Sequence, residues 1–140
     1  MTFNGTTGTL NGNWVATGNL FDHAATGLAS GLTASGTLTS SGINTATTTY
    51  TSSGYPLVVM FGVTITEQPL NSFVTMSLLV GGSSVKSEKF LAASGTNSPA
   101  SDFIVLAYGA GTYTFDLNLQ TLGGGLAFTK AEMVIIELKK

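Results

Sequence analysis

The stretch Leu57-Val58-Val59-Met60-Phe61-Gly62-Val63-Thr64-Ile65 decides the fold class of this chain. Its apolar side chains at every second position, from Leu57 to Ile65, fall on one face of an extended strand, because successive side chains of a β-strand point to opposite faces. Glu67-Gln68-Pro69 follows and ends the run. The stretch therefore predicts a strand with one face in a hydrophobic core.

Similar segments, separated by Gly-based turns, continue to the end of the chain. We expect strands at 45–51, 73–80, 84–91, 113–120 and 126–138. Gly81-Gly82 predicts a tight hairpin between two of them. The segment 92–101 is small and polar, as loops are. The run from Phe103 to Tyr108 is apolar without alternation, which predicts a strand covered on both faces.

The composition supports an all-β protein. Gly, Thr and Ser together fill 54 of the 140 positions, and only 9% of the residues are charged, against roughly 25% in a typical soluble domain. Gly, Thr and Ser are poor helix formers, and no segment keeps a helical period over three turns. Seven or eight short strands favour an antiparallel β-sandwich of the jelly-roll kind.

The totals also exclude several classes of function. The net charge of -2, with no Arg, provides no basic surface for nucleic acid. No apolar run approaches the ~20 residues that span a bilayer, so no membrane association is expected. Cys is absent, which removes thiolate chemistry and disulfides. The N-terminus shows no basic region followed by an apolar core, so we expect a protein assembled in a cytoplasm.

Residues 1–44 differ from the rest, and we predict that they form an extended attachment arm, while residues 45–140 form the head domain. Asp22 is the only charged residue among the first 55. A flexible Gly/Ser/Thr-rich linker is the alternative. The arm is favoured because the segment carries regularly placed large apolar residues. The predicted partner-binding residues are Phe3, Leu10, Trp14, Leu20, Phe21, Leu28 and Leu32.

Three segments of the head resemble the small jelly-roll head domains of bacteriophage fibres and related virion proteins, which are similar in shape to the C1q and tumour-necrosis-factor heads. The segments are 48–59, with Ser52-Ser53-Gly54-Tyr55-Pro56 at its centre, 108–115, and 133–138. The resemblance implies a trimer. Because the chain starts at Met1 without a long shaft region, it favours a small virion protein over a complete tail fibre.

Catalytic patterns are missing from the sequence. The sequence has a single histidine, His23, and no G-x-S-x-G motif that would supply a nucleophilic serine for it to activate. The acidic residues Glu67, Asp102 and Asp116 lie in separate segments. No His pair and no Asp-rich loop predicts a metal or cofactor site, although an ion on a trimer axis stays open. We therefore expect a protein that is not an enzyme.

Two functions remain. The first is a structural virion protein: a trimeric phage capsid decoration protein that binds the major capsid protein, or another virion protein, through its arm. The second is the receptor- or glycan-binding head of a tail fibre, a C1q-like lectin. In that case the loops 66–72 and 92–101, or aromatic residues such as Trp14, Tyr50, Tyr55 and Tyr108, would contact host saccharide.

Overall fold

The computed structural model describes residues 29–66, 71–122 and 126–138, with side chains from residue 36 onward. This part of the chain consists of eight strands joined by turns and short loops. They are β1 (Ala29–Thr37), β2 (Ile43–Ser53), β3 (Leu57–Ile65), β4 (Ser72–Val80), β5 (Ser83–Ala92), β6 (Ser98–Leu106), β7 (Ala110–Thr121) and β8 (Ala127–Glu137).

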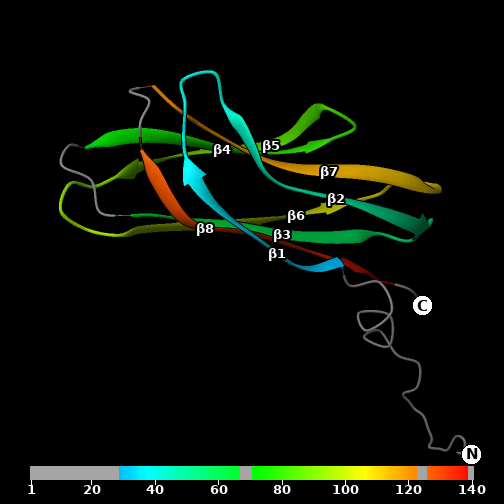
Figure 1. The fold of residues 1–140 in the computed structure, drawn as a ribbon. Helices are drawn as coiled ribbons and strands as arrows, with labels where there is room; N and C mark the ends of the chain where they lie inside the picture. The colour runs from blue at the N-terminus through cyan, green and yellow to red at the C-terminus, as the bar shows by residue number, and fades with distance from the viewer. Residues whose placement is uncertain (1–28, 67–70, 123–125, 139–140) are drawn as a thin grey trace, which may run out of the picture.

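The strands form two antiparallel four-stranded sheets that pack face to face (Figure 1). One sheet has the order β1-β8-β3-β6, and the other has the order β2-β7-β4-β5. Most connections cross from one sheet to the other, and only β4 and β5 are consecutive neighbours. This is the connectivity of a jelly roll, so the expected all-β sandwich is confirmed.

The core lies between the sheets and consists of the alternate side chains that the sequence assigned to it. On β3 the inward side chains from Leu57 to Ile65 are all buried, and on β4 those from Val74 to Val80 are buried as well. β7 adds Phe115, Leu117 and Leu119, each fully buried, and β8 adds Phe128, Ala131, Met133 and Ile135. The period of two therefore located the inner face of β3, β4 and β7, whereas on β8 it is interrupted between Phe128 and Ala131.

The sandwich begins before the expected boundary at residue 44. β1 pairs with β8, with Ala29 opposite Ile135, and β2 starts at Ile43. Leu38 is fully buried, and its N–H donates to the Leu126 carbonyl at 2.6 Å. Residues 29–44 are thus part of the sandwich. A Gly/Thr/Ser-rich segment can add an edge strand because backbone groups, not side chains, make the ladder.

Of the predicted partner-binding residues, Leu32 lies in β1, with its Cα opposite that of Met133. The other six, from Phe3 to Leu28, lie outside the described residues.

The expectation for the run from Phe103 to Tyr108 is wrong. Within the described strands β6 pairs only with β3, so it is an edge strand. Phe103 is 60% exposed and Val105 is 55% exposed. The apolar run therefore has one covered face and one open face. The expected loop 92–101 is also shorter, because β5 extends to Ala92 and β6 begins at Ser98.

Candidate interaction surfaces

The outer face of the β1-β8-β3-β6 sheet carries a continuous group of apolar side chains on its last three strands. In the register of the sheet, Met60 of β3 lies between Phe103 of β6 and Val134 of β8. One step along, Val58 lies between Val105 and Ile136 in the same way. We call this set the apolar outer face; it consists of Val58, Met60, Phe103, Val105, Val134 and Ile136.

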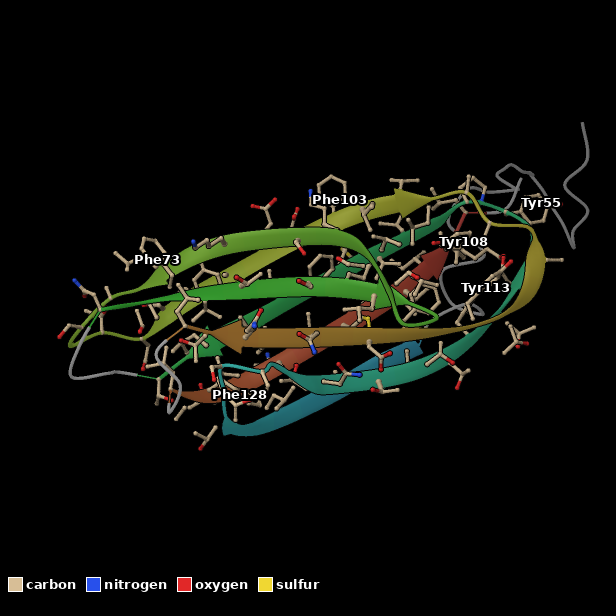
Figure 2. The ribbon with its side chains drawn as sticks, turned by 90° about the horizontal axis from the view of Figure 1, so that it is seen from above. Tyr55, Phe73, Phe103, Tyr108, Tyr113 and Phe128 are labelled. Carbon is tan, nitrogen blue, oxygen red and sulfur yellow. The ribbon has the colours of Figure 1, made fainter. Side chains whose placement is uncertain are left out.

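The apolar outer face is open to solvent in the described part of the chain. Met60 is 41% exposed, beside the still more exposed Phe103 and Val105 of β6. Figure 2 shows Phe103 projecting from the sandwich. Single exposed apolar residues are ordinary, but a contiguous group of them marks an interaction site.

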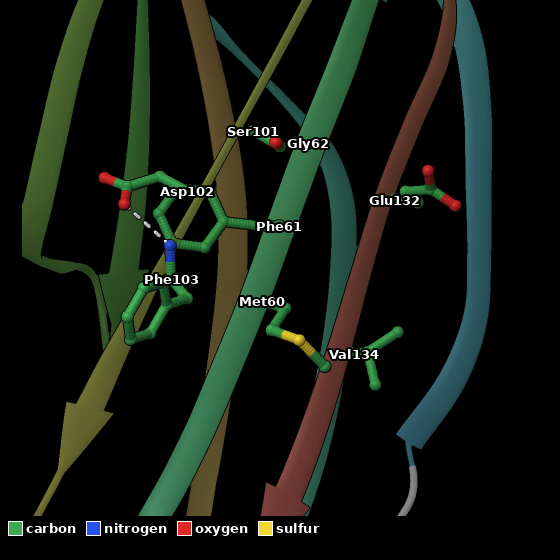
Figure 3. Close-up of a pocket in the computed structure, with 8 residues that line it drawn as sticks. All are labelled: Met60, Phe61, Gly62, Ser101, Asp102, Phe103, Glu132 and Val134. Carbon is green, nitrogen blue, oxygen red and sulfur yellow. Dashed lines mark hydrogen bonds between the residues drawn. The ribbon is translucent and has the colours of Figure 1, made fainter.

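A hollow of about 580 Å³ lies in this face, around Gly62 (Figure 3). Gly62 pairs with Ser101 on one side and with Glu132 on the other. A Cβ at position 62 would come within 3.1 Å of the Ala100 carbonyl oxygen and 3.2 Å of the Ser101 Cβ. Gly62 thus has no space for a Cβ, and the hollow above it is lined by the polar Ser101 and Glu132 and by the apolar Met60, Phe103 and Val134.

The charged groups around the apolar outer face are paired with each other. Lys130 Nζ is 3.1 Å from Glu132 Oε1, and Lys86 Nζ is 2.9 Å from Asp102 Oδ2. Burial would raise the pKa of the Asp102 carboxyl, but Lys86 and the Phe103 N–H outweigh it and lower that pKa. The rim of the face therefore carries ion pairs of balanced charge.

Asp102 also affects the open edge of β6. Its Oδ1 accepts the backbone N–H of Phe103 at 2.7 Å. A side chain that occupies a backbone donor of an edge strand makes that edge a poorer template for pairing with another strand. β6 thus offers a partner its outward side chains more readily than its backbone.

A second surface lies at one end of the sandwich, where Tyr50, Tyr55, Tyr108 and Tyr113 gather. We call it the tyrosine end. The rings of Tyr108 and Tyr113 stack with their centroids 4.9 Å apart, and Tyr50 is opposite Tyr113 in the β2–β7 ladder. Tyr55, in the turn between β2 and β3, is 39% exposed. Figure 2 shows Tyr55, Tyr108 and Tyr113 at the same end of the molecule.

A buried carboxylate supports the tyrosine end from inside. Glu137, the last residue of β8, is 1% exposed, and its Oε1 accepts the Ser52 hydroxyl and the Ser53 N–H, each at 2.7 Å. Burial would raise the pKa of Glu137, but hydrogen bonds from the Ser52 hydroxyl and from Ser53 and the backbone of Tyr55 outweigh it, and the pKa is lowered. Burial and the neighbouring Glu137 carboxylate raise the pKa of Tyr50, whose hydroxyl is hydrogen-bonded to that carboxylate.

This structural role of Glu137 was not expected from the sequence. The signal was present, because Glu137 continues the inward positions of an apolar strand. A lone carboxylate in such a place needs partners, since an unpaired buried charge is very costly.

The acidic residues considered for catalysis do not form a reactive site in the described chain. Asp102 is paired with Lys86, and Asp116, on the other sheet, accepts the Thr47 hydroxyl. His23 and Glu67 lie outside the described residues. No group of three or more His, Cys, Asp or Glu side chains able to hold a metal ion occurs among residues 29–66, 71–122 and 126–138. Nor does that part of the chain contain a helix long and apolar enough to cross a membrane.

Comparison with known proteins supports the fold and assigns no family. No family model and no curated protein matches the sequence. Among solved structures, a chain from the structure of infectious bursal disease virus Gx strain is similar over 79% of this chain, with a TM-score of 0.53 and 8% identity. This region corresponds to 32% of the viral chain, so our protein spans about a third of its length. At this identity the likeness extends to the fold alone.

A second similar structure is the CBM36-1 domain of a multidomain xylanase from the hindgut metagenome of Trinervitermes trinervoides. The similar region covers 79% of this chain and 86% of that domain, with a TM-score of 0.46 and 18% identity. The strand order described above and the likeness to the viral chain both identify an all-β protein with a jelly-roll sandwich.

Proposed function

We propose that the protein is a non-enzymatic structural protein of a bacteriophage virion, a capsid decoration protein that acts as a homotrimer. The observation that carries this proposal is the apolar outer face. Burying a large apolar side chain completely contributes about 1.5–3 kcal/mol, so covering half-exposed residues such as Phe103, Val105 and Met60 would contribute about 1 kcal/mol each. Contacts of this kind suit a protein that functions in an assembly.

The charges around the face are compatible with contact between identical copies. Because Lys130 is paired with Glu132, and Lys86 with Asp102 and Glu88, a second copy would meet charges that already have partners. Closed symmetric oligomers are the usual assemblies of identical chains, and the trimer follows from the resemblance of the head segments to phage heads.

Attachment to the shell is assigned to residues 1–28, which precede the sandwich. This segment has one charged side chain, Asp22, and holds six of the seven predicted partner-binding residues. Fully extended, it reaches up to about 90 Å. Three copies in a trimer would bind with avidity, because the second and third contacts become intramolecular.

The test compares the full chain with a variant that lacks residues 1–28. The deletion stops at residue 28 because β1 begins at Ala29 and a longer deletion would remove an edge strand. We expect both proteins to sediment as trimers, and only the full chain to cosediment with capsid shells that lack it. That binding should depend weakly on salt, since the segment has almost no charge. Shell binding by the shortened protein would refute the attachment role.

The second candidate is the receptor- or glycan-binding head of a tail fibre. The tyrosine end favours it, because aromatic rings beside hydroxyl groups suit the binding of sugars. The location of the protein in purified particles, by cryo-electron microscopy, separates the two candidates: on the shell for a decoration protein, on the tail for a fibre head.

The absence of catalysis is part of the same proposal. Incubation of the full chain with host surface polysaccharide should release no shorter products. Release of such products by the wild type, abolished when a single acidic residue is substituted, would overturn this part of the proposal.

A further inference from the structure

All four tyrosines of the chain lie at the tyrosine end, although they come from distant parts of the sequence. Tyr50 and Tyr113 lie opposite each other on β2 and β7, and Tyr108 stacks on Tyr113. Tyr55 projects from the neighbouring turn and is 39% exposed. The fold therefore concentrates this residue type at one place.

The rings are held in position before any ligand arrives. The Tyr113 hydroxyl donates to the Gly109 carbonyl at 3.0 Å, which fixes the ring against which Tyr108 stacks. Glu137 is hydrogen-bonded to Tyr50, and it accepts the Ser53 N–H in the strand that leads to Tyr55. Preorganised aromatic groups lose little conformational entropy on binding, so a contact with them is stronger than with mobile side chains.

The described residues next to the tyrosines in the sequence are uncharged. No described residue within two positions of any tyrosine along the chain carries a charge. Glu137, the carboxylate beneath, is 1% exposed. Thr51 and Thr112, whose hydroxyl oxygens are 3.0 Å apart, alternate with Tyr50 and Tyr113 and point to the outer face of the sheet, so the exposed hydroxyl near the turn of Tyr55 is that of Ser53. This surface differs from the apolar outer face, which has no hydroxyl among its six residues.

We infer that the tyrosine end binds a neutral saccharide. The C–H face of a pyranose ring would stack on Tyr55, which is 39% exposed, beside the half-buried Tyr108, and its hydroxyls would exchange hydrogen bonds with the tyrosine hydroxyls and Ser53. Among the described residues no cation lies next to a tyrosine in the sequence to pair with an acidic sugar, and this favours a neutral glycan. The inference rests on the second function proposed above.

The test is affinity electrophoresis of the full chain in native gels that contain one soluble polysaccharide each: a mixed-linkage β-glucan, a galactomannan, dextran or the anionic alginate. Retardation by at least one neutral polysaccharide is expected, and none by alginate. Tyr55→Ala and Tyr108→Ala should each weaken that retardation at least tenfold, while Tyr55→Phe keeps the ring and most of the binding.

Phe73→Ala is the matched control, because Phe73 is also a half-exposed aromatic residue, 50% exposed, and lies at the opposite end of the sandwich (Figure 2). Circular dichroism of each variant establishes that the sheets are intact. Passage of the full chain through all three neutral gels without retardation would overturn the inference, as would equal retardation of the Tyr→Ala variants and the wild type. Either result leaves the shell-sedimentation test of the structural role unaffected.

Discussion

Glu137 is the polar group on which one end of the sandwich depends, and its replacement provides a quantitative test. Glu137→Gln keeps the volume of the side chain and the Oε1 acceptor that receives the Ser52 hydroxyl and the Ser53 N–H. Each of these bonds changes from charge-assisted to neutral, a loss of about 1 kcal/mol per bond. We expect the free energy of unfolding to fall by about 2 kcal/mol, which corresponds to a decrease of about 8–10 °C in Tm.

The pH dependence of the difference identifies the carboxylate as its source. The pKa of Glu137 is lower in the folded protein than its ordinary value of 4.5. The charged form is therefore favoured by folding, and its contribution to stability is complete above the unfolded-state pKa and declines as the pH falls through the folded-state pKa. The stability difference between wild type and Glu137→Gln should thus shrink between pH 5 and pH 3.

The assay is urea denaturation followed by circular dichroism at one fixed protein concentration, because the stability of an oligomer depends on concentration. Ser52→Ala, which removes one of the hydrogen bonds to Glu137, should cost less than Glu137→Ala, which removes all of them. The reasoning is refuted if Glu137→Gln lies within about 0.5 kcal/mol of the wild type at pH 7, or if the difference stays constant down to pH 3.

Three shorter predictions concern the apolar outer face and the ion pair of Lys86 on β5 with Asp102 on β6, which joins the two sheets. Phe103→Asp should convert trimers to monomers in sedimentation velocity at micromolar concentration without altering the circular dichroism spectrum. Phe73→Asp, on the other sheet, should leave the trimer intact. A trimer that survives Phe103→Asp would exclude this face from the subunit contact. Gly62→Val should lower the free energy of unfolding by about 1–3 kcal/mol, because even a Cβ at position 62 is within 3.1 Å of a backbone oxygen. An unchanged urea midpoint would contradict that close contact. Lys86→Gln should lower Tm more at low salt than at high salt, since the ion pair with Asp102 is partly exposed; a salt-independent change would show that the charge of Lys86 is not the cause.

The sequence located much of the head correctly because the alternation of side chains is a local property. The inward residues of β3, from Leu57 to Ile65, could be assigned without knowing any neighbour, and the Gly81-Gly82 hairpin could be assigned from its two turn residues. At these positions the alternation of apolar and polar side chains along a single strand is enough to tell which face is buried.

The errors arose where the answer depends on distant parts of the chain. The apolar run from Phe103 to Tyr108 suggested a covered strand, but β6 has only β3 beside it among the described strands. The composition of residues 29–44 suggested an arm, but β8, almost a hundred residues later, supplies the backbone partner of β1. Neither neighbour is visible in the local pattern.

The sequence by itself determined the all-β class, the inner face of β3, β4 and β7 and the low proportion of charged residues. Only the tertiary structure decided which strands lie at the edges, how Met60, Phe103 and Val134 become one apolar face, and how four scattered tyrosines meet above Glu137. The physical reason is the range of the interactions involved. Side-chain alternation acts over a few residues, whereas strand order is chosen by packing and hydrogen bonds between segments far apart in the chain.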